Sequence, residues 1–397
     1  MDKTKRALWI AVFTLVSWRL CAQTQPPPQI DSESTGKAEF EPRMGISGTL
    51  EGEVRWMRHH DTRNNAVPSS DIYLRTFELG METAFLDWAS ATAVLNSEWI
   101  DDAVNVGDQQ LTVDEAHLDI DIPSTSLYMV LGKRTQPFGL FENSLVTEPI
   151  TQDAYEIQKV GLSIGVRGPA DLDVSMTGYK GREQMNHLFQ SRILDSAAVK
   201  SQATDPVEVS SFITALSVSP VRDEIVLFGA FLSEPGWCAR NTSINVGFHL
   251  DGSASSRVML DGEYMKALQR ERYAAMDHAY HENILSMSLS YMFTSNPGHV
   301  RGSGNYAARK SELQSHPVEI AVRYEALDDD GLSENERVWS VKNRFSMGGR
   351  TSFHNDAKVT VYLAVEARRT EYRVPPDVQE TMAKPNDEVY VRLGIGF

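Results

Sequence analysis

The sequence has few cysteines, a single apolar run and a minority of basic residues. Two cysteines among 397 residues cannot form a disulfide framework. The apolar run, residues 7–18, is shorter than the roughly 20 residues that a membrane-spanning helix needs. With 38 basic against 54 acidic residues, the net charge is −16, which repels polyanions and excludes nucleic acid as a partner.

The N-terminus has the three parts of an export signal. Lys3 and Arg6 precede the apolar run, and Ala22 follows it as a small residue for cleavage, so we expect a signal peptide over 1–22. The residues before Cys21 lack the small side chains that lipoprotein processing favours, which disfavours a lipid anchor there. Cleavage leaves Cys238 alone, so the exported chain depends on extensive backbone pairing or on a large core.

Proline and polar residues dominate the next stretch, 23–43, which shows no apolar period. This composition predicts a flexible or polyproline-like lead-in. The remaining residues, 44–397, are expected to form the folded domain.

Apolar residues occupy every second position through this domain. Near its start, Leu50 and Trp56 alternate with Glu51 and Glu53, and helical spacing does not fit. The pattern predicts about sixteen strands, at 45–57, 71–86, 89–100, 112–122, 126–134, 160–168, 171–181, 209–218, 224–233, 242–250, 257–267, 283–294, 317–326, 337–348, 357–369 and 387–397. Transmembrane strands need about 9–11 residues and even strand numbers are the rule in bacterial barrels. We therefore predict an all-β fold, a closed transmembrane antiparallel β-barrel.

The connections between the predicted strands alternate in length. Those at one end, such as 87–88, 123–125 and 169–170, are short and rich in turn residues, whereas most at the other end are long and polar. Short periplasmic turns and longer external loops are typical of outer-membrane barrels. Residues 295–316 break the rule, which indicates either an unusual turn or a misplaced hairpin. A soluble sandwich or propeller is the alternative, but sixteen such strands exceed one core and no propeller repeat is present.

Three segments carry a resemblance to a known family. They are 113–118, 132–143 and 145–151, which include the sequences Gly132-Lys133-Arg134 and Glu148-Pro149. Together they resemble the signature of the LbtU-type siderophore porins. That family belongs with the phosphate-selective porins O and P to a group of sixteen-stranded outer-membrane channels.

The resemblance implies a porin of the Gram-negative outer membrane that takes up small solutes passively, with ferric siderophores as candidate solutes. It implies contact with outer-membrane lipid and lipopolysaccharide, and it leaves a homotrimer open. The last strand, which ends at Phe397, resembles the signal read by the barrel-assembly machinery. The alternative function is a barrel whose external loops bind a ligand or catalyse a reaction at the cell surface.

Two sets of polar residues are candidates for the pore. The alternation turns the following strand residues toward the lumen: Glu51, Glu53, Glu115, Asp119, Asp121, Lys342, Arg344 and Arg392. The third external loop, 134–159, is expected to fold inward and to bring these residues to a constriction: Lys133, Arg134, Glu142, Glu148 and Asp153. Acidic residues on early strands and basic ones on late strands predict a transverse field. The alternatives are solvated charge without a selective role and a loop that covers the mouth.

Motifs for enzymes and metals do not fit this pattern. Gly161–Gly165 reads G-x-S-x-G, but the alternation continues through it, whereas a nucleophile elbow needs a strand-to-helix turn. Ser163 is therefore expected to be a strand residue that faces the pore. The acidic run 328–331 lacks the spacing of an EF-hand. We expect no catalytic residues, no cofactor and no metal site.

Overall fold

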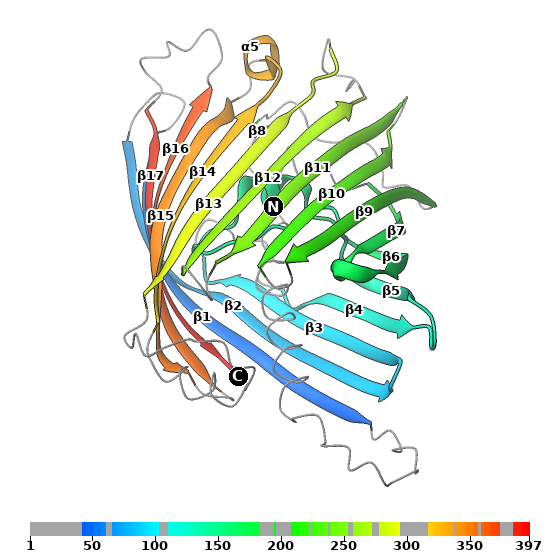
Figure 1. Ribbon diagram of the computed structural model, residues 1–397. Helices are drawn as coiled ribbons and strands as arrows, with labels where there is room; N and C mark the ends of the chain where they lie inside the picture. The colour runs from blue at the N-terminus through cyan, green and yellow to red at the C-terminus, as the bar shows by residue number, and fades with distance from the viewer. Residues whose placement is uncertain are drawn as a thin grey trace.

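The computed structural model describes thirteen stretches of the chain, and they form one closed sheet (Figure 1). The stretches are 42–60, 66–102, 110–182, 194–195, 208–221, 224–236, 239–252, 257–271, 278–293, 317–336, 339–355, 359–373 and 384–397. The predicted signal peptide and residues 23–41 of the predicted lead-in lie outside them.

Sixteen long strands make up the sheet. They are β1 Arg43–His60, β2 Ala66–Leu86, β3 Ala89–Ile100, β4 Thr112–Asp121, β5 Leu127–Thr135, β6 Gln158–Arg167, β7 Asp173–Lys180, β9 Val209–Val221, β10 Ile225–Pro235, β11 Arg240–Asp251, β12 Val258–Gln269, β13 Asn283–Phe293, β14 Val318–Asp328, β15 Trp339–Asn355, β16 Thr360–Arg373 and β17 Asn386–Gly396. The two-residue β8, Leu194–Asp195, pairs with the start of β15. Short helices are α2 Ile150–Tyr155, η2 Pro169–Asp171 and α5 Leu332–Glu336. No helix in the described part of the chain is long and apolar enough to cross a membrane.

The first and last strands close the barrel. β1 pairs with β17 antiparallel from Thr49 opposite Gly396 to Arg58 opposite Asp387, and each of the other long strands pairs antiparallel with its sequence neighbour. In Figure 1 the blue β1 and the red β17 lie side by side. Closure removes the unpaired edge that an open sheet would expose. The prediction of a closed all-β barrel of sixteen strands is therefore confirmed.

The two ends of the barrel differ in their connections. At one end, which we call the turn end, β2–β3, β4–β5 and β6–β7 are joined by at most five residues. The opposite end, the loop end, carries α5 at the top of Figure 1. Phe293 pairs with Val318, so β13 and β14 are neighbours and no hairpin was misplaced there. Residues 294–316 between them lie outside the described residues.

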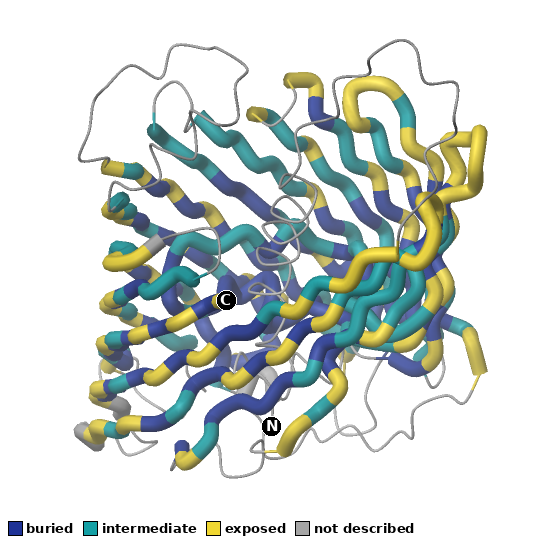
Figure 2. The backbone as a smooth tube through the Cα atoms, turned by 90° about the horizontal axis from the view of Figure 1, so that it is seen from below, coloured by how far each residue is buried: buried dark blue, intermediate teal, exposed yellow. Residues whose placement is uncertain are grey.

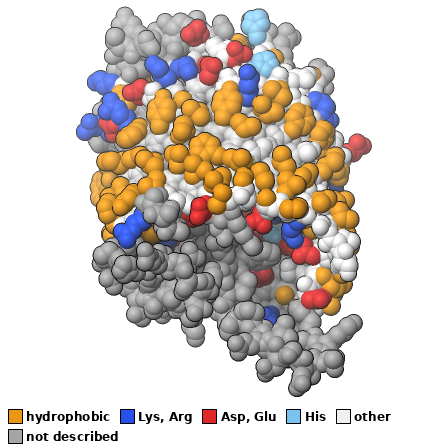
Figure 3. Space-filling view, in the orientation of Figure 1, with side chains coloured by type: hydrophobic (Ala, Val, Ile, Leu, Met, Phe, Trp, Pro, Cys, Tyr) orange, Lys and Arg blue, Asp and Glu red, His pale blue; other side chains and the backbone are white. Residues whose placement is uncertain are grey.

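The alternation of the sequence becomes two faces of the sheet. Outward side chains such as Ile46 and Ile72 are 62% and 72% exposed, whereas inward Glu51 and Glu53 are 0% and 2% exposed. Figure 2 shows buried and exposed positions alternating along the strands. Figure 3 shows a broad apolar band across the face of the barrel in view. A band of this extent marks a surface that contacts lipid or another protein.

Candidate functional site

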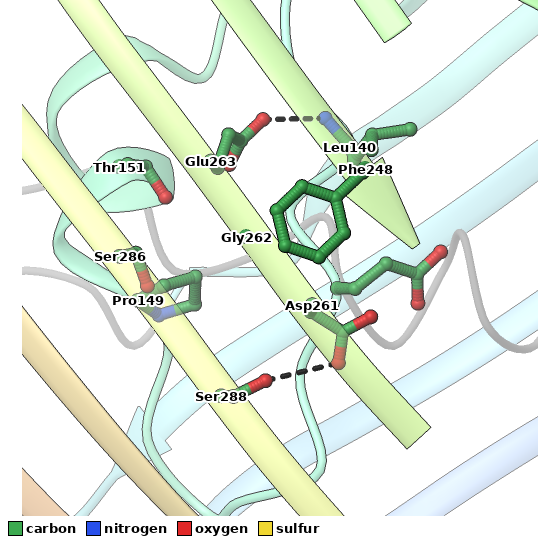
Figure 4. Close-up of a pocket in the computed structure, with 10 residues that line it drawn as sticks. Leu140, Pro149, Thr151, Phe248, Asp261, Gly262, Glu263, Ser286 and Ser288 are labelled. Atoms are coloured by element: carbon green, nitrogen blue, oxygen red, sulfur yellow. Dashed lines mark hydrogen bonds between the residues drawn. The ribbon is translucent and has the colours of Figure 1, made fainter. Parts of the chain in front are cut away.

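The segment between β5 and β6, residues 136–157, is bonded to inward side chains of distant strands. The backbone N–H of Leu140 donates to Glu263 of β12 at 2.7 Å, drawn in Figure 4. The backbone N–H of Thr147 donates to Glu366 of β16 at 2.6 Å. Hydrogen bonds to a carboxylate are stronger than neutral ones, so wall carboxylates fix the path of this segment.

Two more carboxylates hold the helical part of the segment. The backbone N–H at the start of α2, that of Ile150, donates to Glu325 of β14. The hydroxyl of Tyr155, the last residue of α2, donates to Glu282 at 2.8 Å, just before β13. Because the first N–H groups of a helix lack partners within it, Glu325 satisfies a group that would otherwise be buried without a bond.

Arg323 of β14 is the basic residue that binds the middle of residues 136–157. It is 1% exposed and lies 3.2 Å from Glu325. Its guanidinium donates to the side chains of Asn143 and Thr147 at 2.7 and 3.1 Å and to the backbone carbonyl of Glu148 at 3.0 Å. A planar guanidinium can bind several acceptors at once, so one side chain ties the middle of the segment to the wall.

Apolar packing completes the attachment. We call the inward apolar face of β9, β10, β12 and β13 the docking wall; its residues are Ile213, Leu232, Met265 and Ile284, each 0% exposed. They form one buried cluster with Phe138, Tyr155 and other residues of the segment. The rings of Phe138 and Tyr155 stack at 5.4 Å. Burying each large side chain contributes about 1.5–3 kcal/mol.

Two inward glycines make room for the segment. A Cβ at Gly247 of β11 would lie 3.1 Å from Leu140, and one at Gly348 of β15 would lie 2.9 Å from Leu145 and 2.4 Å from a backbone oxygen. Larger residues at these two positions would push the segment away from the wall.

The opposite inner surface carries paired charges between buried tyrosines such as Tyr362 and Tyr390, which pack against Val146 of the segment. We call it the charged wall, formed by β16, β17, β1, β2 and β3, with these residues: Arg368, Glu388, Arg392, Glu51, Glu53, Arg55, Arg75 and Glu98. Arg392 lies 2.7 Å from Glu53 and 3.5 Å from Glu51. Arg368 lies 2.6 Å from Glu388. The paired charges run without a break across the seam between β17 and β1.

One ion pair joins the segment to the charged wall. Arg75 of β2 lies 3.6 Å from Glu148 of the segment and 3.2 Å from Glu98 of β3. Its guanidinium lies over the ring of Trp99, 4.0 Å from the centroid. Residues 136–157 therefore contact both walls, and the Glu148 carboxylate of the segment faces the Arg75 guanidinium of the charged wall.

The structure places most predicted pore residues on the inner face. Glu51, Glu53 and Arg392 lie together, and Arg344 of β15 lies 3.5 Å from Asp153 of α2. Arg134 of β5 donates to Ser163 of β6 at 2.9 Å.

On β4, the Asp119 carboxylate lies 3.1 Å from His117. Glu115 lies 3.9 Å from the same imidazole. These two predicted residues thus form a second cluster, away from the contact between Arg75 and Glu148.

Three predicted pore residues lie elsewhere. Lys133 pairs with Ala116 and Val160 in an outward row, because β5 continues to Thr135 and keeps its alternation, so Lys133 faces out of the barrel. Lys342 is exposed because the pairing of β15 with β16 is shifted between Val341 and Asn343, which reverses the alternation there.

Asp121, predicted to face the lumen from its strand, is the third of these residues. It lies at the turn end, 2.6 Å from Arg167, and both side chains are more than half exposed. Since β4 ends at this residue, its carboxylate is at the rim rather than deep in the lumen.

Glu142 lines an open pocket of about 260 Å³ between the segment and β11–β13 (Figure 4). The other carboxylates there are Asp261, which lies 2.5 Å from His249, and Glu263. Burial, together with the neighbouring carboxylates, raises the pKa of Glu142 to about 7. Burial also raises the pKa of Glu156, at the end of α2, well above its ordinary value.

Charge of both signs occurs on early and late strands. The predicted set of acidic early strands omitted Arg55 and Arg75, and the set of basic late strands omitted Glu325, Glu366 and Glu388. All are inward and nearly buried. Their positions in the period-two alternation place them on the inward face, and this could have identified them from the sequence. The lumen therefore contains paired charges where the sequence suggested two separated blocks.

The enzyme and metal motifs lie in structural surroundings. Ser163 is in the middle of β6 and shares a 2.7 Å hydrogen bond with Thr177 of β7, with no strand-to-helix turn there. Across the described stretches, no group of three or more His, Cys, Asp or Glu side chains is placed to hold a metal ion.

The geometry of the barrel is shared with solved outer-membrane proteins. The outer-membrane channel DcaP of Acinetobacter baumannii aligns with a TM-score of 0.58 at 9% identity, over 90% of this chain and 97% of that one. OmpF of Salmonella typhi, solved with daunomycin, gives 0.57 at 12% identity, over 89% and 97%. The anion-selective porin of Comamonas acidovorans gives 0.54 at 9% identity, over 90% and 100%.

These likenesses show the fold alone, because the identities are low. No protein-family profile matches the sequence. No curated protein matches it either. The chain therefore has the sixteen-stranded barrel fold of the outer-membrane porins.

Proposed function

We propose that this protein is an outer-membrane channel through which small polar solutes diffuse passively. The observation that carries the proposal is residues 136–157, held across the lumen by four carboxylates and an arginine of the barrel wall and lying against the paired charges of β2 and β3. The apolar outer band and the closed sheet support membrane insertion, since lipid requires every backbone group to be paired within the protein. The loop end then faces the outside, and the turn end faces the periplasm.

Single-channel conductance in planar bilayers tests this function. Refolded barrel should give stable ohmic steps. A variant with Glu325→Gln and Glu366→Gln weakens two anchors of the segment and should give larger or noisier steps. Glu371→Gln is the matched control, because Glu371 is on β16 like Glu366 but on the outer face. A folded barrel that gives no conductance would contradict the channel proposal.

The finer part of the proposal is a ferric siderophore as solute. It is supported by the resemblance to LbtU-type porins, because two of the three segments that carry it, 132–143 and 145–151, overlap the segment that contacts both walls. A ferric chelate should reduce the conductance reversibly, whereas the iron-free chelator should do so less. Absence of block would reject the siderophore and leave the channel proposal intact.

The same resemblance leaves a homotrimer, contact with lipopolysaccharide and recognition by the barrel-assembly machinery as proposals. Native mass spectrometry of the detergent-solubilised protein distinguishes one, two or three chains. Deletion of Phe397, whose backbone is bonded in both directions to Gly48 at 2.9 and 3.0 Å, should reduce the amount of assembled barrel in cells.

A further inference from the structure

The pocket between residues 136–157 and strands β11–β13 is lined by hydrogen-bond acceptors. The polar atoms of its side chains are carboxylate and hydroxyl oxygens, which belong to Glu142, Thr151, Asp261, Glu263, Ser286 and Ser288. Figure 4 shows those of α2, β12 and β13 around one common space. Among the described residues that line the pocket, none carries an ammonium or guanidinium group.

Two of the three carboxylates are held by groups of the barrel itself. Asp261 lies 2.5 Å from the imidazole of His249. Glu263 accepts hydrogen bonds from the backbone N–H of Leu140 and from the side-chain amide of Asn245, at 2.7 and 2.8 Å. Because both of these donors are neutral, the negative charge of Glu263 is hydrogen-bonded but not compensated.

Glu142 is the third carboxylate, and it has no such partner. Within the part of the chain that the structure describes, its side chain makes neither an ion pair nor a hydrogen bond. The basic group that acts on it is His249, which Asp261 already holds. A carboxylate that is largely removed from water is costly to ionise unless a cation or a donor compensates it. The pocket therefore has more negative charge than the cations around it balance.

The charged wall shows that this imbalance is local. There the carboxylate of Glu53 lies 2.7 Å from Arg392, and that of Glu388 lies 2.6 Å from Arg368. A solute cation would have to compete with a guanidinium for each of these carboxylates. At Glu142 it meets no such competitor, so the pocket is the place in the lumen where a solute cation gains most.

The lining favours an ammonium group over a metal ion. In the described stretches, no group of three or more His, Cys, Asp or Glu side chains is placed to hold a metal ion. An alkylammonium group instead offers three N–H donors that can reach separate acceptors, and its bonds to carboxylates are charge-assisted. Leu140 and Pro149 line the same pocket and provide apolar surface for a short carbon chain.

We propose that this pocket binds the protonated amino group of small aliphatic amines, with Glu142 as the main acceptor. The inference deepens the proposed function and rests on it, because the amine must reach the pocket through the lumen. Leu140, Glu142 and Thr151 belong to residues 136–157, whereas Asp261 and Glu263 belong to β12. A bound amine therefore contacts the segment and the barrel wall at once.

Isothermal titration calorimetry of the detergent-solubilised full barrel tests the inference, with the heat of titration into protein-free detergent subtracted. The probe is butylammonium chloride, at a pH above the pKa of about 7 of Glu142. Butanol is the uncharged probe of the same length, and tetramethylammonium is a cation without N–H donors. Glu142→Gln removes the charge and Glu142→Asp retains it. Glu388→Gln is the matched control, because it removes a lumenal carboxylate that Arg368 already pairs. Heat-modifiable gel mobility follows folding.

We expect butylammonium to bind at least about tenfold more tightly than butanol or tetramethylammonium. Glu142→Gln should remove most of this difference, whereas Glu142→Asp and Glu388→Gln should keep it. Equal binding of the three probes, an unaffected Glu142→Gln variant, or an equal loss in Glu388→Gln would overturn the inference. Calorimetry does not depend on conduction, so a folded barrel that binds butylammonium without conducting would reject the channel alone. A conducting barrel that does not bind it would reject the amine site alone.

Discussion

The docking wall and the charged wall have the same strand geometry and the same alternation, but they use it differently. Inward positions of the docking wall are apolar and fully buried, for example Leu232 and Met265. Inward positions of the charged wall carry pairs such as Arg392 with Glu53. The comparison indicates that apolar burial on the docking wall adds to the carboxylates and Arg323 that hold residues 136–157, while the charged wall presents paired charges to the remaining lumen.

The largest expected effect comes from removing the cation that joins the segment to the wall. Arg323→Ala leaves Glu325 without its nearest cation and removes three hydrogen bonds to the segment. We expect the free energy of unfolding to fall by about 3–5 kcal/mol, measured by urea titration of tryptophan fluorescence. Arg323→Lys keeps the charge but not the planar fork and should lose less. Equal stability of Arg323→Ala and wild type would contradict the anchoring role.

Truncation of the docking wall should come second. Leu232→Ala leaves a cavity against the buried cluster, and we expect a loss of about 2–4 kcal/mol in the same urea titration. Leu216→Ala is the matched control, since Leu216 is 47% exposed on the outer face. If both substitutions cost the same, the inner cluster contributes nothing beyond ordinary surface burial.

A change in the charged wall should alter ion selectivity more than it alters the attachment of residues 136–157. Arg75→Gln leaves Glu148 and Glu98 without the cation that they share. A unit charge at 4 Å in water is worth about 1 kcal/mol, so the cation-to-anion permeability ratio should rise by up to about fivefold, read from reversal potentials in a salt gradient. Lys342→Gln should leave the ratio unchanged, because Lys342 is exposed outside the lumen.

The smallest expected effect is a pH dependence. The pKa of Glu142 is raised to about 7, so its carboxyl is neutral in the fold below that pH and ionised above it. Cation preference should therefore increase as pH rises through 7, and the stability that neutral burial provides should decline from about pH 4.5 to 7. Glu142→Gln should flatten both curves. Unchanged curves in this variant would assign the titration to another group.

The sequence was informative wherever the period-two pattern continued undisturbed. Residues 89–100 were predicted as a strand and β3 spans these residues, and the inward parity of Glu51, Glu53 and Arg392 followed from alternation alone. Whether a residue points inward or outward depends on the local strand register, so a shift in that register reverses the expected direction. Lys342 was misplaced because of a shifted register in β15, and Lys133 because it was grouped with the inward loop although it occupies an outward position of β5.

The anchors of the segment were beyond sequence reasoning for a different reason. Glu263, Glu325 and Glu366 bind backbone groups that are 123, 175 and 219 positions away in the chain. Nothing in the local pattern distinguishes such a carboxylate from one that is merely hydrated. The turn chemistry of 136–157 was visible, but its partners depend on how the sheet closes.

The seam between β1 and β17 has a consequence for biogenesis. Residues near position 50 pair with residues near 395, so the sheet keeps two open edges until β17 has joined β1. Pairing over such a sequence separation is slow, and an unpaired strand edge invites aggregation. These edges are therefore exposed to aggregation before closure, and a variant that lacks β17 should accumulate as a protease-sensitive intermediate.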